Sequence, residues 1–514
     1  MIARPLRDVA VDGVLVVLGA VALALAFPRT DWSGTAWIAL APLVALALLR
    51  PPRAALALGW LGGFVFFLLL LRWLNFTFRV YSAIPWPLVW LPTALLAAYC
   101  GLYFGLFAGA VSWLVARRSA VVAVAAAPFL WVAGEWLRGT LMGGFPWGTL
   151  GYSQFRQLAA IQIAELGGIY AVSFVVIAVN VALGSIVALP RRAAGAALGV
   201  AAVLVVATLA FGSARLRETD RASSEGASVA IVQPSIAQPL KWDPGFAAAS
   251  LQIYFGLTRQ AGRARPTLIV WPETASPTLL RHDPELVRAL QALSADVGAP
   301  LLVGSVDAEA TSPPTYRNTA FLLDERGIEN RYDKIHLVPF GEYVPLSWVL
   351  GFVRGWAEFI ADLEPGSRAV VFAGPPAPFG TVICYEGIFP ALVRRFVLGG
   401  ARFMVNMTND GWFGQTDGPL QHLGMYPFRA VEHRIAVVRA ANTGVSALIL
   451  PNGEIVRSLP LFTRDTLDGR IPLRTRQTLY TRFGDWLAYV ALAVSALVLA
   501  SGRPWRRETG SRTC

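Results

Sequence analysis

The sequence predicts a polytopic α-helical membrane domain with about eight transmembrane helices, joined to an extracytoplasmic α/β domain. Only 15% of the 514 residues are charged and 55% are hydrophobic, whereas soluble globular chains carry about 25% charged residues. Long apolar segments fill residues 1–216, and short β-rich runs fill residues 226–478. We therefore expect a polar linker over 217–225 and, in residues 479–514, a final transmembrane helix with a basic tail.

Seven apolar segments in the first part are candidates for membrane spans. Several reach the ~20 residues that a helix needs to cross a bilayer, and the second is short enough to be tilted or partly buried. They cover residues 11–27, 35–49, 54–74, 86–115, 119–137, 165–189 and 194–214. The stretch Phe27-Pro28-Arg29 offers no small-residue cleavage site, so we predict that the first segment is a retained anchor rather than a signal peptide.

Basic residues in the loops predict the orientation of the chain. They precede the first span and follow the second, fourth and sixth, at Arg4, Arg7, Arg50, Arg53, Arg117, Arg118, Arg191 and Arg192. The positive-inside rule then places the N-terminus in the cytoplasm and residues 226–478 outside the membrane. A last apolar run, 486–500, is followed by Arg503 and predicts a cytoplasmic C-terminus. The net charge of +12 fits contact with anionic lipid headgroups better than nucleic acid.

The second part has the pattern of a layered α/β domain with a buried mixed sheet. Its short apolar runs cover residues 228–233, 267–271, 300–304, 319–323, 381–384, 403–406 and 446–450. Helical patterns lie between several of them, over 284–297 and 427–441. Strands that alternate with helices, together with strands in hairpins, favour this fold class.

The chain has three cysteines, Cys100, Cys384 and Cys514, which form no disulfide framework. Its four histidines show no metal-ligand spacing, so we predict no metal and no cofactor. Cys384 ends an apolar run and is followed by Tyr385, Glu386 and a glycine, which is how a nucleophile is presented after a buried strand. Taken alone, a cysteine in this setting is more often a buried structural thiol.

Two further strand ends carry ionisable groups. Glu273 follows the Leu-Ile-Val run, and Lys334 follows a hairpin that leads to Glu342. A glutamate can deprotonate a thiol, and a lysine can lower the thiol pKa and stabilise an oxyanion with the backbone N–H of Tyr385. Singly, Glu273 is more often a turn residue and Lys334 a solvated charge, and Glu342 and Glu386 are compatible with ordinary surface acids.

In the order Glu, Lys, Cys these motifs are specific. Trp271-Pro-Glu273, Tyr332-Asp-Lys334 and Ile383-Cys384-Tyr-Glu386 resemble the motifs of the nitrilase superfamily. With the spans, Val338-Pro-Phe-Gly-Glu342 and Asn409-Asp-Gly-Trp412, the chain resembles the bacterial apolipoprotein N-acyltransferases.

This resemblance implies an αββα sandwich on the periplasmic side of the inner membrane, with both termini in the cytoplasm. It also implies two substrates, a phospholipid acyl donor and a diacylated apolipoprotein acceptor, which react in turn through a cysteine thioester. Glu273 is then the general base, Lys334 the oxyanion and thiolate stabiliser, and Cys384 the nucleophile. Glu342 supports the lysine and base, while Tyr385 and Glu386 shape the pocket. We expect a monomer.

Tryptophans near the expected outer membrane face are candidates for substrate contact. They are Trp147, Trp242, Trp348, Trp356 and Trp412. The apolar stretch 346–359 reads either as a lid that dips into the membrane or as a core helix. Interface tryptophans also serve as simple anchors. Glu135 and Arg138, near the end of the fifth span, are expected to pair with each other or to reach the interface.

Two other function classes stay open at this point. The first is a membrane-tethered amidase that hydrolyses small amides, although an anchor needs only one span. The second is a transporter or scaffold with an inactive outer domain, although few charged residues lie inside the spans.

Overall fold

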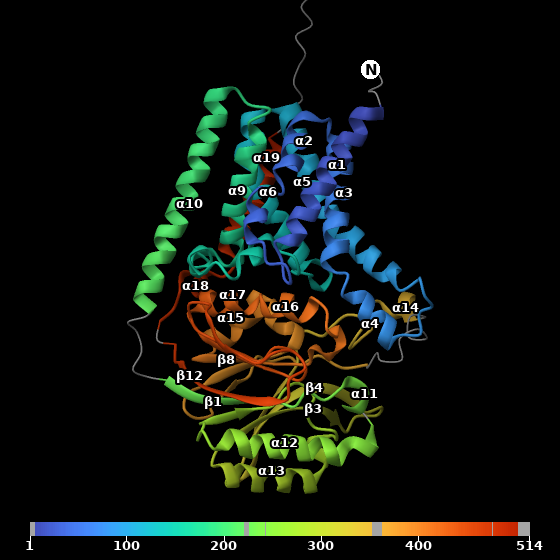
Figure 1. The fold of residues 1–514 in the computed structure, drawn as a ribbon, viewed down its shortest axis with the longest axis vertical. Helices are drawn as coiled ribbons and strands as arrows, with labels where there is room; N and C mark the ends of the chain where they lie inside the picture. The colour runs from blue at the N-terminus through green and yellow to red at the C-terminus, as the bar shows by residue number, and fades with distance from the viewer. Residues whose placement is uncertain (1–5, 220–225, 242, 352–361, 475, 502–514) are drawn as a thin grey trace, which may run out of the picture.

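The computed structural model describes residues 6–219, 226–241, 243–351, 362–474 and 476–501. A helical bundle stands on a layered α/β domain, and one long helix, α10, runs along the outside of the bundle (Figure 1). The longer helices of the bundle are α1 (Leu6–Leu25), α2 (Ala41–Leu49), α3 (Pro52–Leu70), α5 (Trp90–Arg117), α6 (Ala120–Thr140), α9 (Ile169–Ser185), α10 (Arg191–Thr219) and α19 (Trp486–Ala500). Shorter helices are α4 (Leu74–Tyr81), α7 (Leu158–Ile161) and α8 (Ala164–Gly167).

Close packing of α3 on α5 depends on glycine. A Cβ atom at Gly63 would lie 2.8 Å from the Cα of Gly101, and one at Gly101 would lie 2.8 Å from the backbone nitrogen of Phe64. Small residues let membrane helices approach until their backbones touch. The bundle is therefore held by backbone-to-backbone contact at this crossing.

The helices lie where the sequence predicts apolar segments. The number of membrane spans stays a prediction. Among the described residues, four helices are long and apolar enough to cross a membrane: Pro52–Leu70, Trp90–Arg117, Ala120–Gly143 and Arg191–Glu218. A pair bent by 119°, over 158–185, counts as a fifth if it forms one span. The remaining apolar helices, Val9–Leu25, Ser33–Leu49 and Trp486–Ala500, are shorter.

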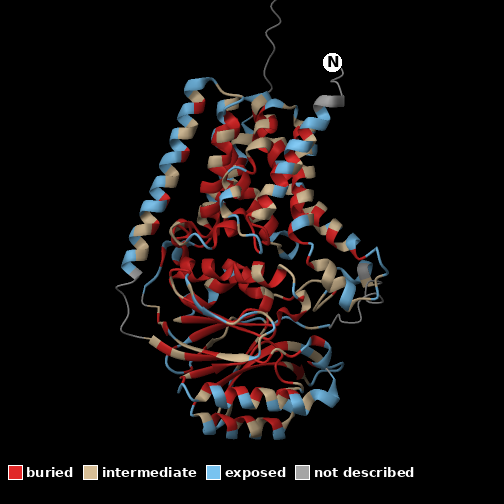
Figure 2. Ribbon diagram, in the orientation of Figure 1, coloured by how far each residue is buried: buried red, intermediate tan, exposed pale blue. Residues whose placement is uncertain are grey.

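Helix α10 differs from its neighbours in burial. Only 17% of its most apolar window is buried, against 56% for the helix that begins at Ala120. Figure 2 shows exposed residues along most of α10, which stands apart from the bundle. An apolar helix with so much uncovered surface is typical of lipid contact.

The α/β domain contains two six-stranded sheets. The first has the order β12-β1-β2-β3-β4-β5 and the second the order β11-β10-β9-β8-β7-β6. The first sheet comprises β1 (Gly226–Gln233), β2 (Leu268–Val270), β3 (Leu301–Glu309), β4 (Thr315–Asp324), β5 (Gly327–Asp333) and β12 (Asp465–Pro472). The second comprises β6 (Val371–Phe372), β7 (Phe379–Ile383), β8 (Phe403–Thr408), β9 (Ala436–Ala441), β10 (Ala447–Ile449) and β11 (Ile455–Ser458). Each sheet has three neighbouring parallel strands, β1-β2-β3 and β7-β8-β9.

Helices cover the outer face of each sheet, so the domain is an αββα sandwich, as predicted. Helices α12 (Ala247–Gly262) and α13 (Pro284–Val297) cover the first sheet at the end far from the bundle (Figure 1). Helices α15 (Pro390–Leu398), α16 (Gly418–Leu423), α17 (Tyr426–His433) and α18 (Leu479–Phe483) lie between the second sheet and the bundle. One buried apolar cluster runs from the bundle into the second sheet, and the two domains therefore share a core.

Two sequence expectations differ from the structure. The helix expected over 427–441 is wrong, because α17 ends at His433, Arg434 has a φ of 49°, and Ala436–Ala441 form strand β9. All six residues of β9 are buried, and a strand buried on both faces shows no alternation by which to recognise it. Helix α10 also continues to Thr219, into the stretch that was expected to be a linker.

Candidate active site

The three predicted catalytic residues stand at the ends of strands from both sheets. Glu273 follows β2, Lys334 follows β5 and Cys384 follows β7. The Nζ atom of Lys334 lies 3.4 Å from Oε1 of Glu273, and both charges act on the thiol of Cys384. All three side chains are buried or nearly so. The structure therefore brings together three residues that are spread over 112 positions of sequence, from 273 to 384.

The backbone is strained at both of the turns that carry the acid and the thiol. Cys384 has a φ of 52° and Thr274, next to Glu273, has a φ of 45°. Residues with a side chain rarely adopt this left-handed region, and such residues cluster at functional sites. Strand β3 approaches the Glu273 turn closely, because a Cβ at Gly304 would lie 2.4 Å from the carbonyl oxygen of Pro272. Only glycine fits at that position.

A second carboxylate holds the lysine. Oε1 of Glu342 accepts a hydrogen bond from Nζ of Lys334 at 2.8 Å, and Oε2 accepts one from the backbone N–H of Val338 at 2.8 Å. The amide of Asn318 donates to Oε1 of Glu273 at 2.8 Å and to Oε1 of Glu342 at 3.0 Å. The two carboxylates are thus fixed on either side of one ammonium group.

These neighbours set the protonation of the site. Burial raises the pKa of the Cys384 thiol far above its ordinary value; Glu273 raises it further, and Lys334 opposes this. Burial alone would lower the pKa of Lys334, but Glu342 and Glu273 outweigh it and raise that pKa. The resting site therefore holds a neutral thiol beside a permanent ammonium group. A thiol in this state needs a base at the moment of attack.

A second lysine lies on the other side of the Glu273 turn. Lys241, at the end of α11 (Gln238–Lys241), is buried and donates to the carbonyl oxygen of Glu273 at 2.7 Å and to Oγ1 of Thr274. Burial lowers the pKa of Lys241 to about 8, and Glu273 and Cys384 only partly oppose the change. This lysine braces the strained turn and changes charge near neutral pH.

Glu386 and Tyr385 complete the turn that carries the thiol. Glu386 is fully buried, and its oxygens accept hydrogen bonds from the hydroxyl of Tyr332 at 2.7 Å and from the backbone N–H groups of Ile335, His336 and Ile383. Burial raises the pKa of Glu386 to about 6, against the effect of these donors. The hydroxyl of Tyr385 donates to the carbonyl oxygen of Gly144 in the membrane domain at 3.4 Å. The site therefore borders the bundle.

The predicted lipid-contact residues fall into different settings. Trp147 is buried between the domains, and Trp412 packs against Tyr81 of α4 with ring centroids 4.9 Å apart. Trp348, in α14 (Ser347–Leu350), is 84% exposed. Trp242 and Trp356 lie outside the described residues, as does most of the stretch that we read as a lid or core helix. Of the predicted lipid-contact tryptophans, the structure describes Trp147, Trp348 and Trp412, and among these three Trp348 alone is mostly exposed.

Glu135 and Arg138, near the end of α6, are both buried and form hydrogen bonds with the loop that follows this helix. Oε1 of Glu135 accepts the backbone N–H of Leu150 at 2.6 Å, and Arg138 donates to the carbonyl oxygens of Phe145 and Trp147. Both side chains are therefore held inside the protein by hydrogen bonds to the loop that carries Trp147.

Sequence reasoning missed three residues that touch the acid. Besides Asn318 and Lys241, the backbone N–H of Asn409 donates to Oε2 of Glu273 at 2.9 Å. Asn318 gave no clear signal, because it stands between two other polar residues of β4, Arg317 and Thr319. Lys241 ends the short helix α11, and Asn409 follows β8 in a motif that the sequence analysis noted without its contact to Glu273. The partners of both are more than 30 residues away in sequence, and no local pattern reveals such contacts.

Over the residues that the structure describes, no group of three or more His, Cys, Asp or Glu side chains is placed to hold a metal ion. The donors at the site are instead a thiol, two carboxylates and an ammonium group. This set suits acyl transfer through a covalent intermediate.

Comparisons with known proteins agree with this arrangement. Residues 228–480 match the carbon-nitrogen hydrolase model, and residues 19–182 match the model of the apolipoprotein N-acyltransferase N-terminal domain. Among solved structures, an amidase from Nesterenkonia sp. aligns at 20% identity and a TM-score of 0.38, over 53% of this chain and 98% of that chain. By family match, the molecule is a carbon-nitrogen hydrolase domain combined with a membrane domain.

Relatives of similar length give the family. The apolipoprotein N-acyltransferase of Geobacter metallireducens is 37% identical over 499 residues, which cover 95% of each chain. That of Chromobacterium violaceum is 34% identical over 96% of this chain and 95% of its own. The chain therefore belongs to the apolipoprotein N-acyltransferase family, which confirms the resemblance seen in the sequence. It is a multi-pass inner-membrane enzyme of lipoprotein biosynthesis.

Proposed function

We propose that this chain transfers a fatty acyl chain from a membrane phospholipid, through a thioester on Cys384, to the N-terminal α-amine of a diacylglyceryl-cysteine in an apolipoprotein. The observation that carries the proposal is the buried ammonium of Lys334, held between Glu273 and Glu342 beside a thiol on a strained turn. Family membership supports the substrates, and the geometry supports the roles.

In the first half-reaction, Glu273 takes the proton of the Cys384 thiol as the sulfur attacks the ester carbonyl of the phospholipid. Lys334 and the backbone N–H of Tyr385 stabilise the tetrahedral oxyanion. The carbon–oxygen bond then breaks, and the proton on Glu273 passes to the leaving oxygen. A lysophospholipid leaves, and the acyl group stays on sulfur as a thioester.

In the second half-reaction, the α-amine of the apolipoprotein attacks the thioester carbonyl. Glu273 accepts the proton of the amine, the carbon–sulfur bond breaks, and Glu273 returns this proton to the departing sulfur. A thioester keeps the acyl group reactive while the two lipid substrates exchange at one site. Exclusion of water protects this intermediate, and the buried surroundings of Cys384 favour such exclusion.

We further propose that residues 226–478 face the periplasm, that both termini are cytoplasmic and that the enzyme acts as a monomer. The arginine-rich loops support this orientation. The contact of Tyr385 with Gly144 places the thiol next to the loop that follows α6, which suits a substrate that arrives from the membrane. The exposed Trp348 extends the candidate lipid-contact surface.

Mass spectrometry of the purified protein after incubation with phospholipid vesicles tests the proposal. We expect an acyl adduct on Cys384 that hydroxylamine removes, that is absent in Cys384→Ala and that is strongly reduced in Glu273→Ala. Addition of a diacylated lipopeptide should discharge the adduct to an amide faster than water hydrolyses it. Preferential hydrolysis would instead favour an amidase, and an adduct on Cys100 would contradict the assignment of the nucleophile.

A further inference from the structure

One glutamine of the α/β domain forms hydrogen bonds with four residues from three separate segments of the membrane domain. The side-chain oxygen of Gln421, in α16, accepts hydrogen bonds from the indole N–H groups of Trp147 at 2.8 Å and Trp73 at 3.2 Å. Its side-chain nitrogen donates to the carbonyl oxygens of Leu70 at 3.1 Å and Pro28 at 3.2 Å. Gln421 is buried, and both of its polar atoms are fully used. All four partners belong to the loops and helix ends that face the α/β domain.

The next residue, His422, points to the back of the nucleophile turn. Its ring contacts Oδ1 of Asp410 at 3.0 Å and the hydroxyl of Tyr426 at 3.2 Å. The hydroxyl of Tyr426 lies 3.0 Å from the carbonyl oxygen of Cys384, to which it donates. Thr408 links the same network to the thiol, since its hydroxyl donates to Oδ1 of Asp410 at 3.1 Å and also acts to lower the pKa of Cys384.

This network is buried, it contains charged groups, and its members form hydrogen bonds with one another. Burial would raise the pKa of Asp410, but Arg439 and His422 lower it below its usual range. Arg439 donates to Oδ2 of Asp410 at 2.6 Å and to Oδ1 of Asn406 at 2.6 Å. These groups sit beneath the turn and are separate from the proposed acid, base and oxyanion groups. They fix the backbone that carries the sulfur.

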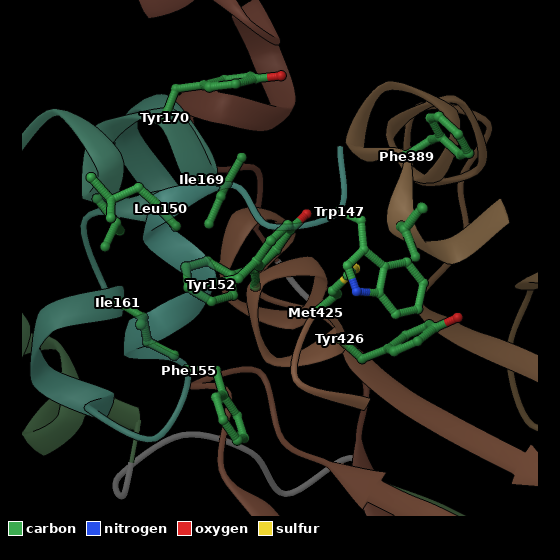
Figure 3. Packing of buried hydrophobic residues seen from close by; sticks show 14 of the residues in the cluster. Trp147, Leu150, Tyr152, Phe155, Ile161, Ile169, Tyr170, Phe389, Met425 and Tyr426 are labelled. Atoms are coloured by element: carbon green, nitrogen blue, oxygen red, sulfur yellow. The ribbon is translucent and has the colours of Figure 1, made fainter. Parts of the chain in front are cut away.

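Trp147 joins the two parts of this arrangement. Its indole donates to Gln421 and lies against the His422 ring, with centroids 5.9 Å apart at 29°. Figure 3 shows Trp147 of the membrane domain in the buried cluster that also contains Met425 and Tyr426 of the α/β domain. Adjacent residues of one short helix thus touch the membrane segments on one side and the support of the nucleophile on the other.

We propose that Gln421 and His422 are positioning residues that hold the membrane segments in register with the Cys384 turn, so that an acyl ester arriving from the bilayer meets the sulfur in a reactive geometry. The inference rests on the proposed function. Gln421 acts on the membrane side, and His422 acts through Tyr426 on the nucleophile side. Neither residue takes part in proton transfer to substrate.

A comparison of two acyl donors tests this division. Acylation of Cys384 is measured by mass spectrometry with vesicles of phosphatidylethanolamine and phosphatidylglycerol, and separately with water-soluble p-nitrophenyl acetate. Gln421→Met keeps the side-chain length and removes the four hydrogen bonds. We expect it to slow acylation from vesicles about tenfold, equivalent to about 1.4 kcal/mol, and to change acylation by the soluble ester less than about twofold. Tyr426→Phe should slow both reactions by a similar factor.

Gln154→Met is the matched control. Gln154 is equally buried, accepts the indole N–H of Trp37 at 3.0 Å and donates to the carbonyl oxygen of Ser33 at 2.9 Å, but all of these partners belong to the membrane domain. We expect this variant to leave the ratio of the two rates unchanged. If Gln421→Met fails to fold, Trp147→Phe keeps an aromatic side chain and removes one of the four hydrogen bonds, and it should show the same selectivity more weakly.

The possible outcomes distinguish a failure of the proposed function from a failure of the role inferred for Gln421. Absence of an acyl adduct on Cys384 in the unmodified chain contradicts the proposed function. An adduct in the unmodified chain, with equal slowing of both donors in Gln421→Met, makes Gln421 a residue of general stability and overturns the inference. Equal selectivity in Gln154→Met and Gln421→Met overturns it as well.

Discussion

Two lysines flank Glu273, and they differ in what surrounds them. Lys334 contacts two carboxylates, whereas Lys241 contacts a carbonyl oxygen and a hydroxyl. Both side chains are buried, and this loss of hydration by itself lowers the pKa of each lysine. The pKa of Lys334 is nevertheless raised and that of Lys241 is lowered to about 8. The partners, not the burial, decide which lysine is a permanent cation.

The difference has opposite consequences for folding. Lys334 binds its proton more tightly when folded, so it stabilises the fold below the unfolded pKa of about 10.5, and this contribution fades as pH rises through the higher folded value. Lys241 binds its proton less tightly when folded. Its unfavourable contribution is complete below pH 8 and is relieved as pH rises from about 8 to about 10.5. One lysine of the pair stabilises the protein, and the other lowers its stability at neutral pH.

Replacement of the permanent cation should have the largest effect. Lys334→Met removes the group proposed to face the oxyanion and leaves Glu273 and Glu342 without their shared partner. We expect the rate of Cys384 acylation in a single turnover to fall about a thousandfold, the loss typical of an oxyanion donor. The thermal unfolding midpoint should also fall, because two buried carboxylates then repel each other. A loss of less than about tenfold would remove Lys334 from the chemistry.

Glu342→Gln makes Lys334 more like Lys241, because a neutral amide replaces one of its two carboxylates. We expect acylation to slow about tenfold, since a charged hydrogen bond of roughly 1.5–3 kcal/mol is weakened. The pKa of Lys334 should fall, so the rate should decline at a lower alkaline pH than in the unmodified chain. The measurement is a pH profile of single-turnover acylation. An unshifted alkaline limb would show that Glu342 does not hold the proton on Lys334.

Sequence reasoning found one of these lysines and missed the other. Lys334 follows a recognisable strand end and stands in the Tyr-Asp-Lys motif, so its role follows from local pattern. Lys241 is the last residue of a short helix, α11, and its partners lie 32 and 33 residues further along the chain. A contact between residues that only folding brings together leaves no periodic pattern in the sequence. The αββα architecture was predictable from the resemblance of motifs, whereas buried strand β9 was read as helix because burial removes alternation.

The domain interface shows the same limit. Trp147 was predicted to contact substrate, but it is buried and bonded to Gln421. From the sequence, a tryptophan after Gly-Phe-Pro in an outer loop is indistinguishable from a membrane-interface anchor. Only the position of α16, 274 residues away along the chain, explains its indole N–H. Substrate contact by Trp147, Trp348 and Trp412 remains a prediction.

Lys241→Met should have the smallest effect, and one that depends on pH. Below pH 8 the ammonium of Lys241 is charged and favours the thiolate of Cys384; above pH 8 it is largely neutral and this assistance is lost. We therefore expect acylation by a soluble ester to be about fivefold slower than in the unmodified chain at pH 6.5, as an interaction of ~1 kcal/mol predicts, and the deficit to shrink at pH 9.5, where only the support of the Glu273 turn is lost. Lys334→Met serves as the control. Lys334 keeps its proton across this pH range, so the effect of its replacement should persist. A pH-independent deficit in Lys241→Met would mean that this lysine only braces the Glu273 turn, and the electrostatic distinction between the two lysines would then have no catalytic consequence.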